Sequence, residues 1–140
     1  MAERSGRTAL LLSREHLADL IAHAREEFPN ECCGLLAGRD GRVLRVYRGR
    51  NVDESPFTYR LDERQLLQFL REMDDVGLDI VGIYHSHTAS EAVPSRTDVA
   101  RAFYPEAVYV IISLKNQQAP VVRGFRIVDR AVVEEDVVVP

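Results

Sequence analysis

Two histidines, a serine and an aspartate follow one another closely in this sequence, as His85, His87, Ser95 and Asp98. Seven residues separate His87 from Ser95, and two separate Ser95 from Asp98. Imidazole nitrogens and carboxylate oxygens are zinc ligands, and three protein ligands with one open position are typical of a catalytic zinc ion. The spacing therefore predicts a metal site that can activate water.

The residues around this motif indicate how it is held. The apolar, β-branched run from 78 to 84 is typical of a buried strand. If this strand continues through His87, the two imidazoles project from one face, because strand side chains alternate between faces. Residues 94–98 predict a helix start that continues into 99–103, so Asp98 would arrive from a second rigid element.

Other interpretations of these residues stay open. A histidine at a strand end is often a surface or core residue without a ligand role. Ser95 and Asp98 also match a capping box, which is compatible with metal binding because it would fix the helix that presents Asp98. Two histidines and a carboxylate can hold iron in oxygenases, but so short a chain has no evident place for a bulky organic co-substrate.

Hydrolysis at such a site also needs a carboxylate that is not a ligand and can accept a proton from water. Glu31 is the obvious candidate, since it stands just before a predicted strand that begins at Cys33. A loop-to-strand junction could aim its side chain into a cleft. Without the downstream motif, Glu31 would be interpreted as a solvated loop carboxylate.

The spacing of the whole set resembles the JAMM motif of the MPN (Mov34/PAD-1) metalloprotease family. The motif residues are Glu31, His85, His87, Ser95 and Asp98. The resemblance extends over roughly residues 11–128. The segments that carry it most clearly are Pro29–Gly38, Glu54–Asp62, Tyr84–Thr88 and Pro94–Asp98. The resemblance implies the MPN fold, a single α+β domain over residues 1–140 with a curved mixed sheet flanked by helices.

The resemblance also implies a role for each motif residue. His85, His87 and Asp98 would bind one zinc ion per chain. Glu31 would be the general base and later the proton donor. Ser95 would donate a hydrogen bond to the developing oxyanion. The motif shows no departure that would mark an inactive, scaffold-type member.

Within the family, the likeness is greatest to small bacterial peptidases that release cysteine from the C-terminus of a ubiquitin-like sulfur-carrier protein. This implies cleavage after the carrier's Gly-Gly tail, a reaction of cysteine biosynthesis. An extended tail can bind by adding a strand beside a sheet edge. The candidate contacts are Ser55, Phe57, Tyr59 and Thr88, although the segment around Phe57 could equally be an ordinary surface loop.

Two other functions remain open on the sequence alone. The same chemistry would let the protein act as an isopeptidase that removes a ubiquitin-like protein from lysines. A non-catalytic MPN interaction domain is the third hypothesis, and the complete set of motif residues argues against it.

The composition of the chain limits the classes of protein to which it can belong. The 140 residues are 46% hydrophobic and 29% charged, which is ordinary for one globular domain. The formal net charge of −4 gives no reason to expect nucleic-acid binding. No apolar run is long enough to span a bilayer, and the polar start of the chain predicts a cytoplasmic protein.

Cys32 and Cys33 are neighbours, so a disulfide between them would be strained, and buried thiols are expected. The oligomeric state, including a homodimer, stays open.

The remaining pattern favours a mixed sheet over a regular βαβ array, because predicted strands come before, between and after the helices. Ser13 is expected to cap a helix through about Glu27, with His16 and His23 on its solvated surface. Asp62 and Gln65 predict a second helix start. Predicted strands cover 8–12, 33–37, 43–47, 108–113 and 121–128, and 131–139 is a last strand or a tail that pairs with a partner.

Overall fold

The computed structural model describes residues 9–140. Within them, eight strands form one sheet in the order β7-β6-β5-β4-β2-β3-β1-β8. The strands are β1 (Leu10–Leu11), β2 (Cys33–Arg39), β3 (Arg42–Gly49), β4 (Asp79–His87), β5 (Val108–Ser113), β6 (Val121–Val128), β7 (Ala131–Glu135) and β8 (Val137–Val138). The helices are α2 (Arg14–Glu27), α3 (Glu63–Val76) and α4 (Arg96–Ala100).

The sheet mixes both strand orientations. β4 is central, with β2 antiparallel on one side and β5 parallel on the other. Neighbours along the chain form the antiparallel hairpins β2–β3, β5–β6 and β6–β7. The predicted α+β class with a curved mixed sheet is confirmed. Asp40 and Gly41, which join β2 to β3, have the positive φ angles that a tight Asp-Gly turn requires.

The last strands join the two edges of the sheet. β7 pairs with β6 at one edge, and after Asp136 the chain continues as β8, which pairs with β1 at the other edge. The backbone N–H of Leu10 also donates to the carbonyl of Asp136 at 2.9 Å. Residues 131–139 are therefore two short strands that curl the sheet back toward its own beginning. Thr8, the first residue of the predicted opening strand, lies outside the described residues.

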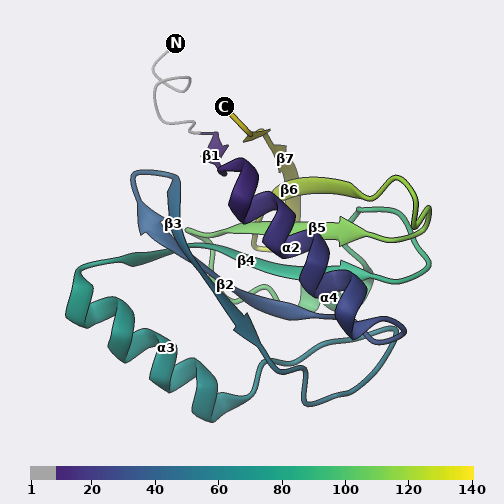
Figure 1. Cartoon of the computed structure of the whole chain (residues 1–140), viewed down its shortest axis with the longest axis horizontal. Helices are drawn as coiled ribbons and strands as arrows, with labels where there is room; N and C mark the ends of the chain where they lie inside the picture. Colours follow the sequence, from purple (N-terminus) through teal and green to yellow (C-terminus); the bar gives the residue numbers. More distant parts are fainter. Residues whose placement is uncertain (1–8) are drawn as a thin grey trace.

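Helices cover both faces of the sheet (Figure 1). On one face α2 contributes Leu20 and Ala24 to a buried core. On the other face α3 contributes Met73, with half-buried apolar side chains of α3 and of the α4 region beside it. Ser13 caps α2 as predicted, and Gly77 ends α3 in the left-handed conformation. No helix among residues 9–140 is long and apolar enough to cross a membrane.

The structure corrects several local expectations. His23 is only 4% exposed, because its Nδ1 lies 2.7 Å from the Tyr84 hydroxyl under α2, and His16 is half-buried. Gln65 does not close a capping box on Asp62, since its side chain accepts from the backbone N–H of Arg50. The helix α4 ends at Ala100 rather than at residue 103. The two cysteines are free and buried, as predicted.

Candidate functional site

Three side chains converge at the end of β4. His85 and His87 point from the same face of this strand, and α4 brings Asp98 against them. The Nε2 atoms of the two histidines are 3.2 Å apart, and they lie 3.1 and 3.0 Å from Asp98 Oδ2. Their ligand atoms all fall within 4.8 Å of one another, and all three residues are buried. The predicted His-His-Asp group is thus assembled by the fold and positioned for metal binding.

The chemistry of this donor set fits a cation. His87 Nδ1 lies 2.8 Å from the carbonyl oxygen of Glu91, which can only accept, so Nδ1 carries a proton. A neutral His87 then directs the lone pair of Nε2 at the carboxylate of Asp98. That contact is repulsive unless a positive charge lies between the two groups. A hydrogen bond from the second ring nitrogen to a carbonyl is also how metal-binding histidines are commonly oriented.

Burial and hydrogen bonding set the charges of the three groups. Burial lowers the pKa of His85. Burial also opposes the charge of His87, but the hydrogen bonds to Asp98 and to the Glu91 carbonyl outweigh it, and the pKa of His87 is raised. The same histidines hold the pKa of Asp98 well below its usual range despite burial. Asp98 is therefore the anion of the group.

Ser95 and Asp98 form a reciprocal capping box at the start of α4. The N–H of Asp98 donates to Ser95 Oγ at 3.0 Å, and the N–H of Ser95 donates to Asp98 Oδ2 at 2.9 Å. The cap fixes the carboxylate against the histidines. The serine hydroxyl accepts in this arrangement, so its own proton is free to be donated elsewhere. The capping interpretation is confirmed, and it is compatible with a second role for Ser95.

Glu31 lies opposite His87. Cys33 pairs with His85 between β2 and β4, and the N–H of Ser86 donates to the Cys32 carbonyl, so the antiparallel register continues to Glu31 opposite His87. Paired residues share a face of the sheet. The side chain is 3% exposed, and its Oε1 has no hydrogen-bond partner among the described residues. Burial raises the pKa of Glu31 to about 8, against the attraction of His87. A solvated loop carboxylate is thereby excluded.

These charges predict proton release when zinc binds. In the metal-free protein at pH 7, Glu31 carries a proton, because its pKa is about 8. The pKa of His87 is also raised above its ordinary value. A divalent cation favours the deprotonated form of both groups, so binding releases protons and tightens as the pH rises toward 8. Calorimetric titration with zinc in buffers of different ionisation enthalpy counts these protons. We expect Glu31→Gln to release fewer, and an equal count in both proteins would contradict the assignment of the raised pKa to Glu31.

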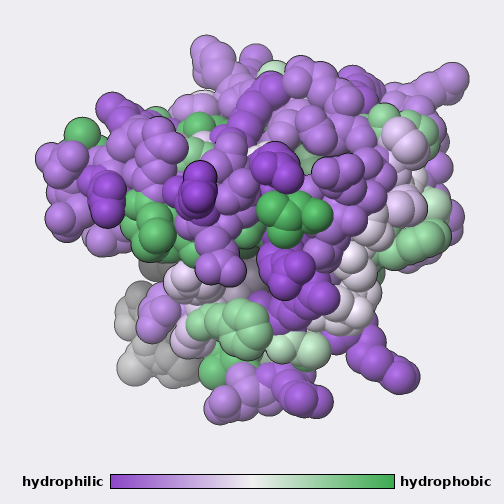
Figure 2. All heavy atoms as spheres, turned by 90° about the horizontal axis from the view of Figure 1, so that it is seen from below, coloured by the Kyte–Doolittle hydropathy of each residue, from purple (hydrophilic) through white to green (hydrophobic). Residues whose placement is uncertain are grey.

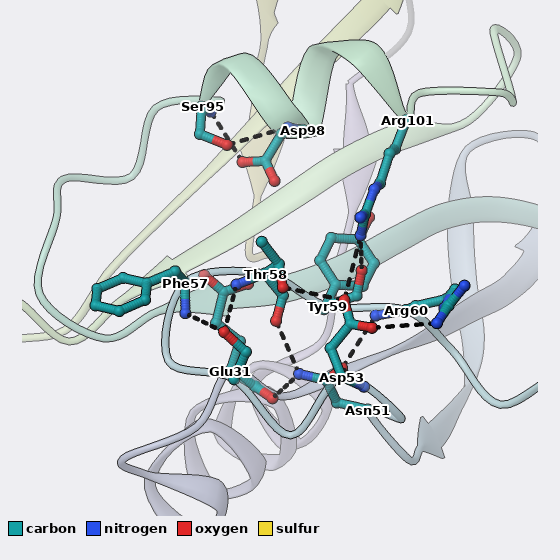
Figure 3. A network of polar contacts seen from close by, with 11 residues as sticks. Glu31, Asn51, Asp53, Phe57, Thr58, Tyr59, Arg60, Ser95, Asp98 and Arg101 are labelled. Atoms are coloured by element: carbon teal, nitrogen blue, oxygen red, sulfur yellow. Dashed lines mark hydrogen bonds and ion pairs between the residues drawn. The ribbon is translucent and has the colours of Figure 1, made fainter.

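The predicted substrate contacts have different surroundings. Phe57 is 77% exposed and points away from the rest of its loop (Figure 3). The ring of Tyr59 stacks on His85 with 4.3 Å between ring centroids. Ser55 Oγ accepts from two backbone N–H groups of its own turn, and Thr88 Oγ1 donates to the Pro56 carbonyl. Phe57 alone among the four has a largely free side chain, and the four stay predictions as substrate contacts.

An apolar cleft of about 390 Å³ is lined by Tyr59 together with residues of α3 and of the segment that follows α4. Its lining includes Leu35, Leu61, Leu66, Ile83, Phe103 and Tyr104. Seen from below, the molecule is mostly hydrophilic, with hydrophobic side chains gathered in separate patches (Figure 2). Because Tyr59 lines the cleft and also stacks on His85, the cleft adjoins the candidate metal site.

Sequence reasoning missed two residues near this site, Asn51 and Arg101. Asn51 is 6% exposed and joins the backbone of Glu31 to the following loop. Arg101 donates to the carbonyl of Tyr59 at 3.0 Å. No periodicity or spacing marks either residue, because their partners lie 20 and 42 positions away in the sequence.

Two known relatives align with most of the chain. A CysO-cysteine peptidase from Mycobacterium tuberculosis strain H37Rv is 45% identical over 140 residues, 98% of this chain and 96% of the relative. A probable TtuB-protein conjugate cleaving protease from Thermus thermophilus is 38% identical over 111 residues, 79% of this chain and 74% of the relative.

Solved structures show the same fold. Protein DSY2949 from Desulfitobacterium hafniense, solved in solution, superposes with a TM-score of 0.84 at 39% identity, over 93% of this chain and 92% of that one. AF2198 from Archaeoglobus fulgidus, a JAB1/MPN domain protein, has a TM-score of 0.58 at 20% identity, over 91% of this chain and 98% of that one, which supports the fold alone. The predicted MPN fold is confirmed.

The family model for prokaryotic homologs of the JAB domain matches residues 13–128. This segment contains all five motif residues, and its limits are close to those over which the sequence resembles the JAMM family. On sequence and fold together, the chain belongs to the family of prokaryotic homologs of the JAB domain.

Proposed function

We propose that this protein is a zinc-dependent metallopeptidase that hydrolyses the bond after the C-terminal Gly-Gly of a ubiquitin-like sulfur carrier and releases cysteine. One observation carries the proposal: the His-His-Asp group is assembled opposite a buried carboxylate whose pKa is about 8, in a chain 45% identical to a CysO-cysteine peptidase. We place the reaction in the cytoplasm.

Zinc, held by His85, His87 and Asp98, would supply Lewis acidity that makes water a nucleophile near neutral pH. Glu31 accepts the proton of the attacking water, and its burial, which raises the pKa, makes it a stronger base than an exposed carboxylate. The water oxygen bonds to the glycine carbonyl carbon and the C–N bond breaks. Glu31 then returns its proton to the amine of the departing cysteine, which leaves a carrier with a free glycine carboxylate.

Ser95 donates a hydrogen bond from its hydroxyl to the oxyanion that forms on the substrate carbonyl. This role does not compete with the helix cap, because the cap uses Ser95 Oγ only as an acceptor. The hydroxyl stands beside Asp98 at the start of α4, on a rigid support. A fixed donor of this kind stabilises the transition state more than the ground state.

Two Ser95 variants separate the cap from the oxyanion role. Both Ser95→Ala and Ser95→Gly remove the hydroxyl, and we expect kcat to fall by about 10²–10³ in each. Loss of the cap destabilises the Ala variant by about 1 kcal/mol but the Gly variant by only a few tenths. Steady-state kinetics and chemical unfolding measure the two effects. An activity loss that followed stability across the pair would assign Ser95 to capping only.

The isopeptidase function is a second candidate, favoured by one observation. The Thermus thermophilus relative, a probable TtuB-protein conjugate cleaving protease, is 38% identical. Hydrolysis of a lysine isopeptide needs the same groups, since the leaving group is again an amine. A non-catalytic interaction domain would need none of the buried charges that converge here.

The deciding experiment offers the zinc-loaded protein two substrates, a carrier–cysteine adduct and a carrier linked to a lysine side chain. We expect free cysteine to be released from the adduct, and the release to stop in the presence of a chelator. Cleavage of the lysine conjugate alone would replace the first function with the second. Zinc-loaded protein that cleaved neither substrate would contradict both.

A further inference from the structure

The segment from Asn51 to Leu61, which we name the clasp loop, contacts every element that carries a motif residue. Its ends meet through an isolated β-bridge between Asn51 and Leu61. The Ser55 carbonyl accepts from the N–H of Glu31 at 2.9 Å. The Pro56 carbonyl accepts from Thr88 just after β4, and Tyr59 stacks on His85. The loop thus touches both the base and the metal-binding strand.

Asn51 is the hub of the clasp loop (Figure 3). Its Nδ2 donates to the carbonyls of Glu31 and Thr58, each at 3.0 Å. Its Oδ1 accepts from the N–H groups of Asp53 and Arg60, also at 3.0 Å. All four bonds join this nearly buried side chain to backbone atoms of other residues. A buried amide with every position satisfied holds its partners in one arrangement.

The clasp loop is also tied to α4. Arg101, which follows Ala100 and caps the C-terminus of that helix, donates to the Tyr59 carbonyl at 3.0 Å and to Asp53 Oδ2 at 3.3 Å. Asp53 Oδ2 accepts a further bond from Thr58 Oγ1 at 3.0 Å. The helix that presents Asp98 and the loop that holds Glu31 therefore share one polar network (Figure 3).

Glu31 itself depends on its backbone for its position. Its Oε1 is buried without a hydrogen-bond partner among the described residues, so this oxygen is held by no such contact. The main chain, in contrast, is bonded on both sides, with its N–H on Ser55 and its carbonyl on Asn51. The reach of the carboxylate toward the metal site is therefore set by how the clasp loop holds this one peptide segment.

We infer that Asn51 is a positioning residue for the reaction, which holds Glu31 at its working distance by tethering its carbonyl to the clasp loop. This inference rests on the proposed role of Glu31 as base. A displacement of about 1 Å of a reacting group can slow catalysis about 10²-fold. Loss of the tether should thus lower kcat and leave substrate binding largely intact.

The test compares Asn51→Ala and Asn51→Asp with a matched control, Gln65→Ala. Asn51→Asp has the same shape and keeps the acceptor, but it replaces the donor that faces the Glu31 carbonyl. Gln65 also makes one side-chain bond to backbone at the base of the same loop, to Arg50, and does not contact Glu31. All proteins are zinc-loaded and assayed on the carrier–cysteine adduct, well below their unfolding temperatures.

We expect both Asn51 variants to lower kcat about 10²-fold, with KM changed less than about threefold, and Gln65→Ala to match the wild type. In a Glu31→Gln background, Asn51→Ala should cause no further loss, because the two residues act as one unit. Losses that multiply in the double variant, or equal effects of Asn51→Ala and Gln65→Ala, would overturn the inference.

A second readout does not depend on turnover. Amide hydrogen exchange at Glu31, followed by NMR, should speed up in Asn51→Ala and stay unchanged in Gln65→Ala, because the tether and the Glu31–Ser55 bond belong to one network. Accelerated exchange in a protein without peptidase activity would support the tether while the proposed function failed. Unchanged amide exchange at Glu31 would contradict the tether, even if the enzyme were fully active.

Discussion

Glu31→Gln is expected to lower kcat by a factor of about 10²–10⁴ while zinc remains bound. The amide has the shape of the carboxylate but cannot accept the proton of the attacking water at neutral pH. Because the carboxylate oxygen Oε1 makes no hydrogen bond among the described residues, the exchange breaks no contact of that atom and the fold should be kept. Cysteine release and zinc content, measured on the same preparation, test both halves of the prediction.

The matched control is Glu27→Gln, four residues upstream. Glu27 is an exposed carboxylate at the end of α2, so its neutralisation should leave kcat within about twofold of the wild type. Near-normal turnover of Glu31→Gln would exclude Glu31 as the base. Loss of zinc together with activity would instead make Glu31 a ligand, which its separate position opposite His87 does not suggest.

Asp98→Asn is expected to remove zinc binding and activity together while the helix cap remains. An asparagine oxygen can still accept from the N–H of Ser95. The asparagine side chain lacks, however, the negative charge of Asp98, which the two histidines stabilise. Zinc at about 1,000 times its Kd stabilises a folded protein by about 4 kcal/mol. We expect the wild type to show a stabilisation of this order on zinc addition in thermal unfolding, and Asp98→Asn to show almost none.

Asp62→Asn separates the ligand role from a general effect of aspartate at a helix start. Asp62 caps α3 by accepting from the N–H of Arg64, away from the metal site. This variant should be stabilised by zinc as much as the wild type. If Asp98→Asn kept the full zinc-dependent stabilisation, Asp98 would be a capping residue only, and the metal site would need another ligand.

The regular elements could be predicted because their signals are local. A short apolar, β-branched run marked β4, and Ser13 and Asp62 marked the starts of α2 and α3. The convergence of the two histidines with Asp98 also followed from local rules, since strand alternation and a helix cap place these side chains. The family resemblance then supplied the fold, which periodicity alone did not specify.

The errors arose where tertiary contacts decided the outcome. His23 lies three residues after Leu20 and one before Ala24, so it belongs to the buried stripe of α2 although its side chain is polar. Tyr84, 61 residues away, provides the partner that makes this burial favourable. Asn51 and Arg101 are likewise defined by distant backbone partners, for which no short sequence pattern exists.

The curled sheet has a practical consequence for how this protein can be handled. β8 joins the sheet beside β1, which pairs with the first residue of β3, at the end of the β2–β3 hairpin where Arg39 faces Arg42. The candidate metal site lies at the other end of β2, where Cys33 faces His85. Seven residues of strand span roughly 20 Å. A linker attached to a sensor surface through Pro140 would therefore leave the end with the motif residues directed outward, open to a partner as bulky as a folded ubiquitin-like protein.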